Sequence, residues 1–384
     1  MTSNIFRFPV QVIFGEGCLK NIGTLAKGFG THALLVTGGS ATSRLGAVAE
    51  LKGFLGDEGI EVTHFAEVEP DPSVETVESG TEFAAQNGCD FVIGLGGGSP
   101  MDAAKVMAAR LNNEGDIASW EGVGKIPGRS KPLICIPTTS GTGSEATSVA
   151  VITGGKRRHK MPLVSQNLYP ILAVIDPELT YGKSPELTAA TGMDALTHAV
   201  ESYVARKAWI PTRILSRESV RLVFTFLERA CNDGGDQEAR RQLSLASFMS
   251  GMAFTNAGLG LNHAIAHALG AQFGLSHGKA NALLLPHVMR FNLESCPELY
   301  RELATAMGAS VSGVPARRAA EQSVEAVEEL VSSLPLPRNL SEAGIAANSV
   351  EKLAAEAFLD TRLRSSNPRD SVYEDVVEIL RNAL

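Results

Sequence analysis

Short runs of consecutive apolar residues dominate the first half of the chain, and segments with a helical pattern separate them. Buried strands are predicted at about 33–37, 61–65, 90–95, 132–137 and 171–176. Helices are predicted between them, ending near 55 and covering about 73–87 and 101–111. Strands that alternate with helices favour a parallel, helix-covered sheet, so we expect a Rossmann-like α/β fold here.

The pattern changes after about residue 180. Residues 184–187 open a helix, and the sequence from there to Leu384 predicts one helix after another, rich in Ala, Leu and Glu. No convincing strand interrupts them. We therefore expect two domains, an α/β domain over 1–180 and an all-helical domain over 181–384.

One stretch of the helical half carries no charged side chain. Residues 242–278 lack Asp, Glu, Lys and Arg over 37 positions, which is longer than the roughly 20 that a membrane span needs. Three histidines and several Asn, Gln and Gly residues interrupt its apolar positions, and histidine is costly at bilayer depth. Buried helices that carry a polar site are the better interpretation.

The amino-acid composition excludes several classes of protein. The net charge of −8 offers no basic stripe for a nucleic acid, and 44% hydrophobic with 20% charged residues is typical of a folded enzyme. The five cysteines are scattered without CxxC spacing, which favours a reducing compartment over a disulfide scaffold. The N-terminus lacks the pattern of a signal peptide, so we expect a cytoplasmic protein without membrane partners.

Two loops rich in glycine and hydroxyl groups follow predicted strands. The first, at 94–100, joins a strand to a helix, where glycines let backbone N–H groups approach a phosphate. The second, at 137–145, offers hydroxyls and backbone N–H groups together. Either loop alone could be a simple turn. Because ligands bind beyond the carboxyl ends of parallel strands, the pair predicts a site for a nucleotide diphosphate.

The helical domain contains a concentration of metal-binding side chains. Asp194 and His198 are four residues apart on a predicted helix, as are His263 and His267, and His277 follows. A lone histidine is most often a structural residue. Three within 15 uncharged positions, together with an Asp-x3-His pair, instead predict a site for Fe, Zn, Ni or Co.

Taken together, these motifs resemble the iron-containing (group III) alcohol dehydrogenases, a family that includes lactaldehyde reductases and 1,3-propanediol dehydrogenases. The resemblance runs over roughly residues 5–300. It rests on four segments in the family's order: 96–105, 137–145, 192–198 and the His-x3-His-x9-His-Gly pattern of 263–278. It implies a dehydroquinate-synthase-like fold and a homodimer or higher homo-oligomer, in which N-terminal strands pair across the interface.

The resemblance also implies roles for individual residues. Asp194, His198, His263 and His277 would bind the metal, and His267 would line the site as a catalytic proton relay. The substrate pocket would include Val149, Phe254 and Leu259. Residues expected to contact the cofactor are Gly38, Gly39, Ser40, Gly97, Gly98, Ser99, Asp102, Thr138, Thr139, Thr147, Val149, Lys160 and Leu179.

The chain departs from the family pattern at Gly38. Members that prefer NAD commonly carry an Asp there, which binds the ribose hydroxyls and repels a 2′-phosphate. Without this Asp the 2′-phosphate of NADP is not repelled, and it could contact Ser40, Thr42, Ser43 or Arg44. The sequence therefore leaves NAD(H) and NADP(H) both open.

The activity implied is a metal-dependent, NAD(P)-linked alcohol dehydrogenase or aldehyde reductase. Hydride would pass between nicotinamide C4 and a small primary alcohol, diol or aldehyde whose oxygen the metal polarises. Fe²⁺ follows from the resemblance, with Zn²⁺ open. The alternatives are an enzyme similar to glycerol dehydrogenase or dehydroquinate synthase, a reductase of a phosphonate or sulfonate aldehyde, and a non-catalytic binding protein. The sequence leaves the physiological substrate and direction open.

Overall fold

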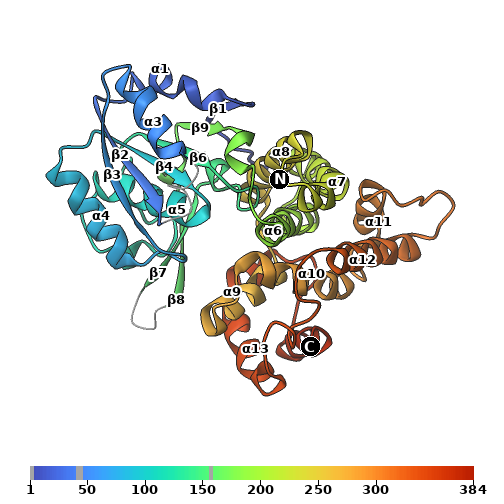
Figure 1. Ribbon diagram of the computed structural model, residues 1–384. Coiled ribbons are helices and arrows are strands. Elements are labelled where there is room, and N and C mark those ends of the chain that lie inside the picture. Colours follow the sequence, from blue (N-terminus) through green and yellow to red (C-terminus); the bar gives the residue numbers. More distant parts are fainter. Residues whose placement is uncertain (1–3, 40–45, 155–158) are drawn as a thin grey trace. The chain divides into compact units, whose positions relative to one another are not determined.

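The computed structural model describes residues 4–39, 46–154 and 159–384 of the chain (Figure 1). Two compact units form. One comprises Phe8–Tyr181, and the other comprises Gly182–Leu384 together with the described residues before Phe8. The backbone N–H of Arg7 donates to Oδ1 of Asn256 at 2.8 Å, which fastens the start of the chain to the second unit.

A six-stranded sheet is the centre of the first unit, and every pairing in it is parallel. The strand order is β1-β9-β6-β4-β2-β3. This confirms the predicted parallel α/β fold and adds an edge strand, β1, that we did not predict. The strands are β1 (Gln11–Phe14), β2 (His32–Gly38), β3 (Glu61–Val68), β4 (Phe91–Gly96), β6 (Leu133–Pro137) and β9 (Leu172–Ile175).

Helices cover both faces of this sheet. In β2, Ala33 and Leu35 pack into the cluster that contains α1 and α3, whereas Leu34 and Val36 pack into the cluster on the opposite face. Both faces are therefore buried, which explains why the strands are unbroken apolar runs. The covering helices are α1 (Ile22–Ala26), α3 (Ala47–Gly56), α4 (Val74–Gln86) and α5 (Gly98–Arg110).

A second, three-stranded sheet was not predicted from the sequence. It contains β5 (Gly122–Val123), β7 (Val149–Gly154) and β8 (His159–Val164), and β7 pairs with β8 in antiparallel fashion. Positions along β7 alternate between buried and partly exposed, and its apolar run, Val149–Ile152, is only four residues long. Short 3-10 turns at Ser144–Ala146, before β7, and at Gln166–Leu168, after β8, connect this region to β6 and β9 of the main sheet.

The second unit is helical throughout its described residues. Within it, α6 packs against α7, α8 and α10 and is buried along most of its length. The helices are α6 (Pro185–Val204), α7 (Ile210–Asn232), α8 (Gln237–Ala257), α9 (Leu261–Phe273), α10 (His277–Asn292), α11 (Pro297–Ala306), α12 (Ala316–Ser333), α13 (Val350–Leu359), α14 (Thr361–Ser366) and α15 (Tyr373–Asn382).

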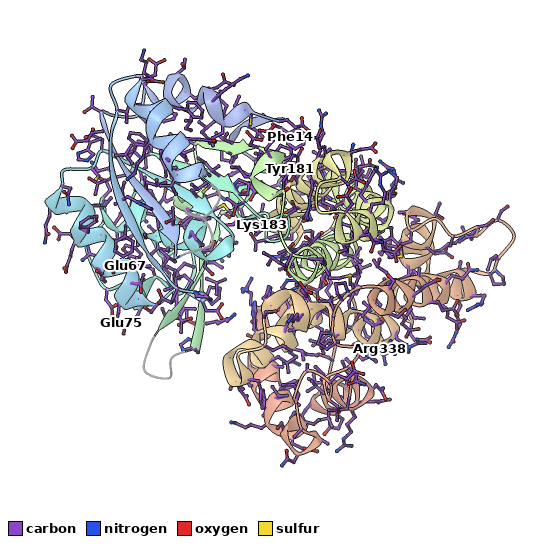
Figure 2. The ribbon with its side chains drawn as sticks, in the orientation of Figure 1. Phe14, Glu67, Glu75, Tyr181, Lys183 and Arg338 are labelled. Atoms are coloured by element: carbon purple, nitrogen blue, oxygen red, sulfur yellow. The ribbon has the colours of Figure 1, made fainter. Side chains whose placement is uncertain are left out.

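The start of α6 is held by a capping serine and a buried arginine. Ser184 accepts a hydrogen bond from the Leu187 N–H, and a proline follows it at the first helical position. Arg240 of α8 donates to the Lys183 carbonyl at 3.2 Å and to the Thr188 hydroxyl at 2.8 Å. Figure 2 labels Lys183 where the chain enters the second unit. These bonds fix the helix on which two of the expected metal ligands lie.

The uncharged stretch 242–278 forms most of α8, all of α9 and the first turn of α10. Two of its histidines, His263 and His277, lie in a polar cluster with Asp194 and His198 of α6. Among the described residues, no helix combines the length and the apolar character that a membrane span requires.

Candidate metal and cofactor sites

Three helices bring four side chains with metal-binding groups together. Asp194 and His198 lie one turn apart on α6, His263 lies in the first turn of α9, and His277 opens α10. One donor atom from each lies within 4.8 Å of all the others. From Asp194 Oδ1, the Nε2 atoms of His198, His263 and His277 are 3.9, 4.0 and 3.5 Å away. These are the four residues that the sequence analysis proposed as metal ligands.

The chemistry of this group fits a divalent metal ion. Asp194, His198 and His263 are only 3, 4 and 1% exposed. Burial lowers the pKa of His263 well below its ordinary value, and nearby His198 and His267 lower it further. His263 is therefore neutral, which is the form of imidazole that binds metals. Three imidazoles and one carboxylate are a donor set that suits iron or zinc.

Asn281 also belongs to this group, and the sequence analysis missed it. Its Nδ2 donates to Asp194 Oδ1 at 2.7 Å and lies 3.3 and 3.2 Å from Nε2 of His263 and His277. The available signal was its position on α10, one turn after His277. An amide is not among the usual metal-binding side chains, so this position alone does not indicate a role in the site.

Glu201 is the second residue that the sequence analysis missed. It lies on α6 three residues after His198 and seven after Asp194, so all three share one helix face. Its Oε2 is 2.5 Å from His263 Nδ1, and its Oε1 accepts the backbone N–H of Asn262 at 2.7 Å. Burial raises the pKa of Glu201 to about 7, although these backbone contacts act in the opposite direction.

His267 lies beside the four-residue group without being part of it. Its ring stacks with that of His277 at 5.5 Å, and its Nδ1 is 3.9 Å from Oδ2 of Asp360. The His267 side chain is 22% exposed. Of the expected pocket residues, Phe254 stacks on the His198 ring at 4.5 Å, and Leu259 packs against the apolar cluster around α9 and α10.

The two expected phosphate-binding loops touch each other in the first unit. A Cβ atom added at Gly98 would lie 2.8 Å from Cγ2 of Thr142, and one at Gly97 would lie 3.4 Å from Oγ1 of Thr139. At Gly98 a side chain would therefore displace Thr142, whereas at Gly97 the contact would be an ordinary one. Gly97 and Gly98 also form the N-terminal end of α5. The arrangement fits a nucleotide diphosphate, which binds to exposed backbone N–H groups at a helix start.

Other residues expected at the cofactor lie in the same unit. The Thr138 N–H donates to the Gly96 carbonyl at 2.9 Å, which joins the second loop to the end of β4. Thr147 and Leu179 are 1 and 8% exposed, and Val149 at the start of β7 is partly exposed. Val149 belongs to the first unit, whereas the other expected pocket residues belong to the second.

Asp102 has its carboxylate engaged by protein groups. Oδ1 accepts the Ser144 hydroxyl at 2.7 Å, and Oδ2 accepts the Val151 backbone N–H at 2.9 Å. Desolvation raises the pKa of Asp102, although the nearby Lys105 ammonium lowers it. Its observed contacts hold the second loop and β7 in place beside α5.

Lys105 is the centre of that connection. It is fully buried, and its Nζ donates to Ser144 Oγ, Thr147 Oγ1 and the Val149 carbonyl at 2.7, 2.9 and 2.7 Å. A buried ammonium that lacked such acceptors would be strongly destabilising. Lys105 therefore ties α5 to the segment that carries two of the expected cofactor contacts, Thr147 and Val149.

Comparison with known proteins agrees with this geometry. Residues 9–177 match the family described as iron-containing alcohol dehydrogenase, and 188–384 match the C-terminal region of the Fe-containing alcohol dehydrogenase family. The chain belongs to the iron-containing alcohol dehydrogenase family. Both family profiles together cover nearly the whole chain, so the resemblance inferred from four short segments is confirmed.

Relatives within the family are similar over their full length. The chain is 37% identical to an NAD-dependent methanol dehydrogenase of Bacillus methanolicus, with both chains covered completely. It is 38% identical to an NADPH-dependent butanol dehydrogenase of Clostridium saccharobutylicum, over 97% of this chain and 96% of the relative. A solved 1,3-propanediol oxidoreductase matches with a TM-score of 0.96 at 35% identity, over 99% of this chain and 100% of that one. The expected dehydroquinate-synthase-like fold is thus confirmed.

This iron-containing alcohol dehydrogenase has an ion pair next to the first glycine-rich loop, at 94–100. The Asp71 N–H donates to Ser99 Oγ at 3.3 Å, and Lys160 Nζ donates to Asp71 Oδ1 at 2.9 Å. Asp71 has a φ of +56° and is the one non-glycine residue with a positive φ in the described part of the chain. Two residues expected at the cofactor, Ser99 and Lys160, are thereby linked through Asp71.

Gly38, where we expected a departure from the family pattern, is the last residue of β2. A Cβ atom there would lie 3.3 Å from the Val68 carbonyl oxygen, so a larger residue fits only tightly. Gly39 follows it in the described part of the chain. Ser40, Thr42, Ser43 and Arg44, which we expected near a 2′-phosphate, lie outside the described residues.

Proposed function

We propose that this chain is a metal-dependent, NAD(P)-linked alcohol dehydrogenase or aldehyde reductase that acts on a small primary alcohol, diol or aldehyde. The observation that carries the proposal is the buried group of one carboxylate and three imidazoles within 4.8 Å of one another. The membership of the iron-containing family and the dehydrogenase names of its relatives support it.

Asp194, His198, His263 and His277 would hold the ion, and we propose Fe²⁺ because of the family. A metal bound there supplies Lewis-acid polarisation of the substrate oxygen. These ligands bind Zn²⁺ more tightly than Fe²⁺ by their intrinsic order of affinity, so the supply of metal decides the occupancy. The stacked Phe254 ring shields His198 on one side and keeps that part of the site apolar.

The two loops of the first unit would hold the dinucleotide. Gly97, Gly98, Ser99, Thr138 and Thr139 bind its phosphates through backbone N–H groups and hydroxyls. The nicotinamide ring supplies or accepts the hydride. Gly38 places no carboxylate where a 2′-phosphate would lie, so we propose that NADP(H) is accepted as well as NAD(H).

His267 would move the proton of the substrate hydroxyl. Its partly exposed side chain gives it a route to solvent, and Asp360 Oδ2 lies 3.9 Å from its Nδ1. A His267→Ala variant should therefore lose most of its turnover. Full turnover of this variant across the pH range would contradict the assignment.

A homodimer is proposed from the resemblance to the family. β1 lies at the end of the strand order and pairs only with β9 among the described strands, so its other edge can accept a strand from a second copy. Light scattering coupled to size exclusion would measure the mass directly. We also propose a cytoplasmic location, to which the five free cysteines are suited.

The decisive experiment is an anaerobic assay of the Fe²⁺-reconstituted protein. Absorbance of NADH and of NADPH is followed separately against short aldehydes, with a phosphonate and a sulfonate aldehyde in the same panel. Metal-dependent oxidation of either cofactor with uncharged aldehydes is expected. Turnover confined to the charged aldehydes would instead make the chain a specialised reductase, and no turnover despite bound metal would contradict the proposal.

Replacement of a ligand provides the control. His263→Ala removes one of four donors, so metal content and activity should fall together. Metal content is measured by plasma mass spectrometry on the same preparation that is assayed. An active variant that contains no metal would contradict the role of this residue group.

A further inference from the structure

Glu201 makes two contacts that together involve one end of a helix and one presumed metal ligand. Its Oε1 accepts the Asn262 N–H at 2.7 Å, and its Oε2 is 2.5 Å from Nδ1 of His263. Glu201 is 4% exposed, and it comes from α6, not from α9 to which both partners belong. One carboxylate thus bridges two helices of the site.

The first contact replaces the usual cap of α9. The N-cap position is Gly260, which has no side chain to accept the free N–H groups of the first turn. Glu201 accepts the one from Asn262, and Asn367 Oδ1 accepts the one from Leu261 at 3.2 Å. A Cβ atom at Gly260 would lie only 3.0 Å from Glu201 Oε1, so the glycine makes room for this carboxylate.

The second contact determines which nitrogen of His263 carries the proton. Asn281 Nδ2 donates to Asp194 Oδ1, a carboxylate that can only accept, and this fixes the orientation of the amide. The same Nδ2 lies 3.3 Å from His263 Nε2, so Nε2 faces a donor and must be unprotonated. The proton of the neutral ring is therefore on Nδ1, where Glu201 accepts it.

We propose that Glu201 is a positioning residue for the metal site, a role that rests on the proposed metal dependence. By accepting both the first-turn N–H of α9 and the Nδ1 proton of His263, it keeps the unshared electron pair of Nε2 directed at Asp194, His198 and His277. Two acceptor oxygens are required, because both partners are donors. Carboxylates that bind the far nitrogen of a ligating histidine generally tune metal affinity in this way.

Glu201→Gln is the variant that tests this role. Glutamine has the same shape but only one acceptor oxygen, so it can accept from the Asn262 N–H or from Nδ1 of His263 but not from both, and its NH2 group faces the other donor. Titration of the metal-free protein with Co²⁺, followed by its visible absorbance, should show a dissociation constant about 10–100-fold weaker than that of the wild type. The melting temperature of the metal-free protein is measured in parallel.

Asn367→Ala is the matched control. Asn367 also caps α9 but touches none of the four presumed ligands, so its loss should lower the melting temperature of the metal-free protein while leaving Co²⁺ affinity near that of the wild type. A wild-type dissociation constant for Glu201→Gln would overturn the proposal. So would equal losses of affinity in both variants, because helix-end stability alone would then explain them.

A measurement without any variant keeps the proposal testable if Glu201→Gln fails to fold. In a crystal structure of the metal-loaded wild type, His263 should bind the ion through Nε2 with Glu201 still on Nδ1. Coordination through Nδ1, or a Glu201 that has left the ring, would overturn the proposal. Wild-type protein that binds no Co²⁺ would overturn it together with the proposed function, whereas bound Co²⁺ without turnover would affect the proposed function alone.

Discussion

Most of the candidate metal site could be predicted from the type and spacing of individual residues. Asp194 with His198, and the histidines of 263–277, stand at spacings that put them on single helix faces, and the structure brings the four together. Glu201 and Asn281 escaped notice because their roles depend on contacts between helices. No spacing along the chain indicates that Glu201 of α6 meets His263 of α9.

Gly38 leads to a prediction about cofactor choice. Gly38→Asp should lower the efficiency with NADPH relative to NADH by about tenfold or more, because two charges 4 Å apart repel by about 4 kcal/mol at an effective dielectric of 20. The ratio of kcat/KM for the two cofactors measures it. Gly38→Ala adds the same tight Cβ atom without the charge, and its ratio should stay at the wild-type value.

The stability of the folded protein should depend on pH through the carboxyl group of Glu145. Burial raises the pKa of this carboxyl from 4.5 to about 7, although Lys105 acts against the shift. The folded state therefore binds more protons than the unfolded state between these values, and stability is lost as the pH rises through 7. Glu145→Gln cannot ionise, so its stability should exceed that of the wild type by up to about 3 kcal/mol at pH 8 and by little at pH 4.5.

Thermal unfolding of both proteins across this pH range would measure the difference. The two melting temperatures should separate progressively above pH 5. A constant gap at every pH would show that Glu145 does not titrate in the folded protein.

Strands were predictable from the sequence where both of their faces are buried, because such strands are continuous apolar runs. The strands β2, β4, β6 and β9 are continuous apolar runs because helices cover both of their faces, and all four were predicted. The edge strand β1 and the pair β7 and β8 were not. No position of β1 is fully buried, and its partner β9 lies far along the chain. In β7 and β8 buried positions alternate with partly exposed ones, so only one face of each strand is covered.

Lys105 joins α5 to the second loop and β7, so the stability of this part of the first unit should depend on it. Lys105→Met keeps the length but leaves Asp102 without its cation and removes three hydrogen bonds, to Ser144, Thr147 and the Val149 carbonyl. Removal of one partner from a buried charge pair costs about 3–5 kcal/mol. Calorimetry should show a less stable protein, and fluorescence titration should show weaker NADH binding with unchanged metal content.

Arg110 on the same helix provides the comparison. It pairs with Glu78 at 3.2 Å in a partly exposed position, and such surface pairs contribute at most about 1 kcal/mol. Arg110→Met should therefore bind NADH like the wild type. Equal loss of NADH affinity in both variants would mean that α5, not the buried network, determines binding.

At the scale of the whole molecule, the two presumed ligand sites are built from different units. The loops around Gly97 and Thr138 lie within Phe8–Tyr181, and all four presumed metal ligands lie within Gly182–Leu384. A bound metal ion or a bound nucleotide stabilises the folded state of the unit that holds it. Chelation of the metal should therefore raise hydrogen exchange in α6, α9 and α10, whereas removal of NADH should raise it around the β4–α5 loop.

Hydrogen exchange followed by mass spectrometry, with peptides from each unit, makes this comparison directly. The expected result is two separate footprints. Metal removal that exposes the β4–α5 loop as strongly as NADH removal does would contradict the independence of the two sites.

The position of the two units along the sequence also determines the order in which the ribosome synthesises them. The sheet of the first unit is complete once β9 has emerged, before Asp194 and long before His277 emerge. Domains generally fold as they emerge, N-terminal first. The nascent chain should thus be able to hold a nucleotide before it can capture an ion, and Arg7, made among the first residues, waits for Asn256 before its final contact can form.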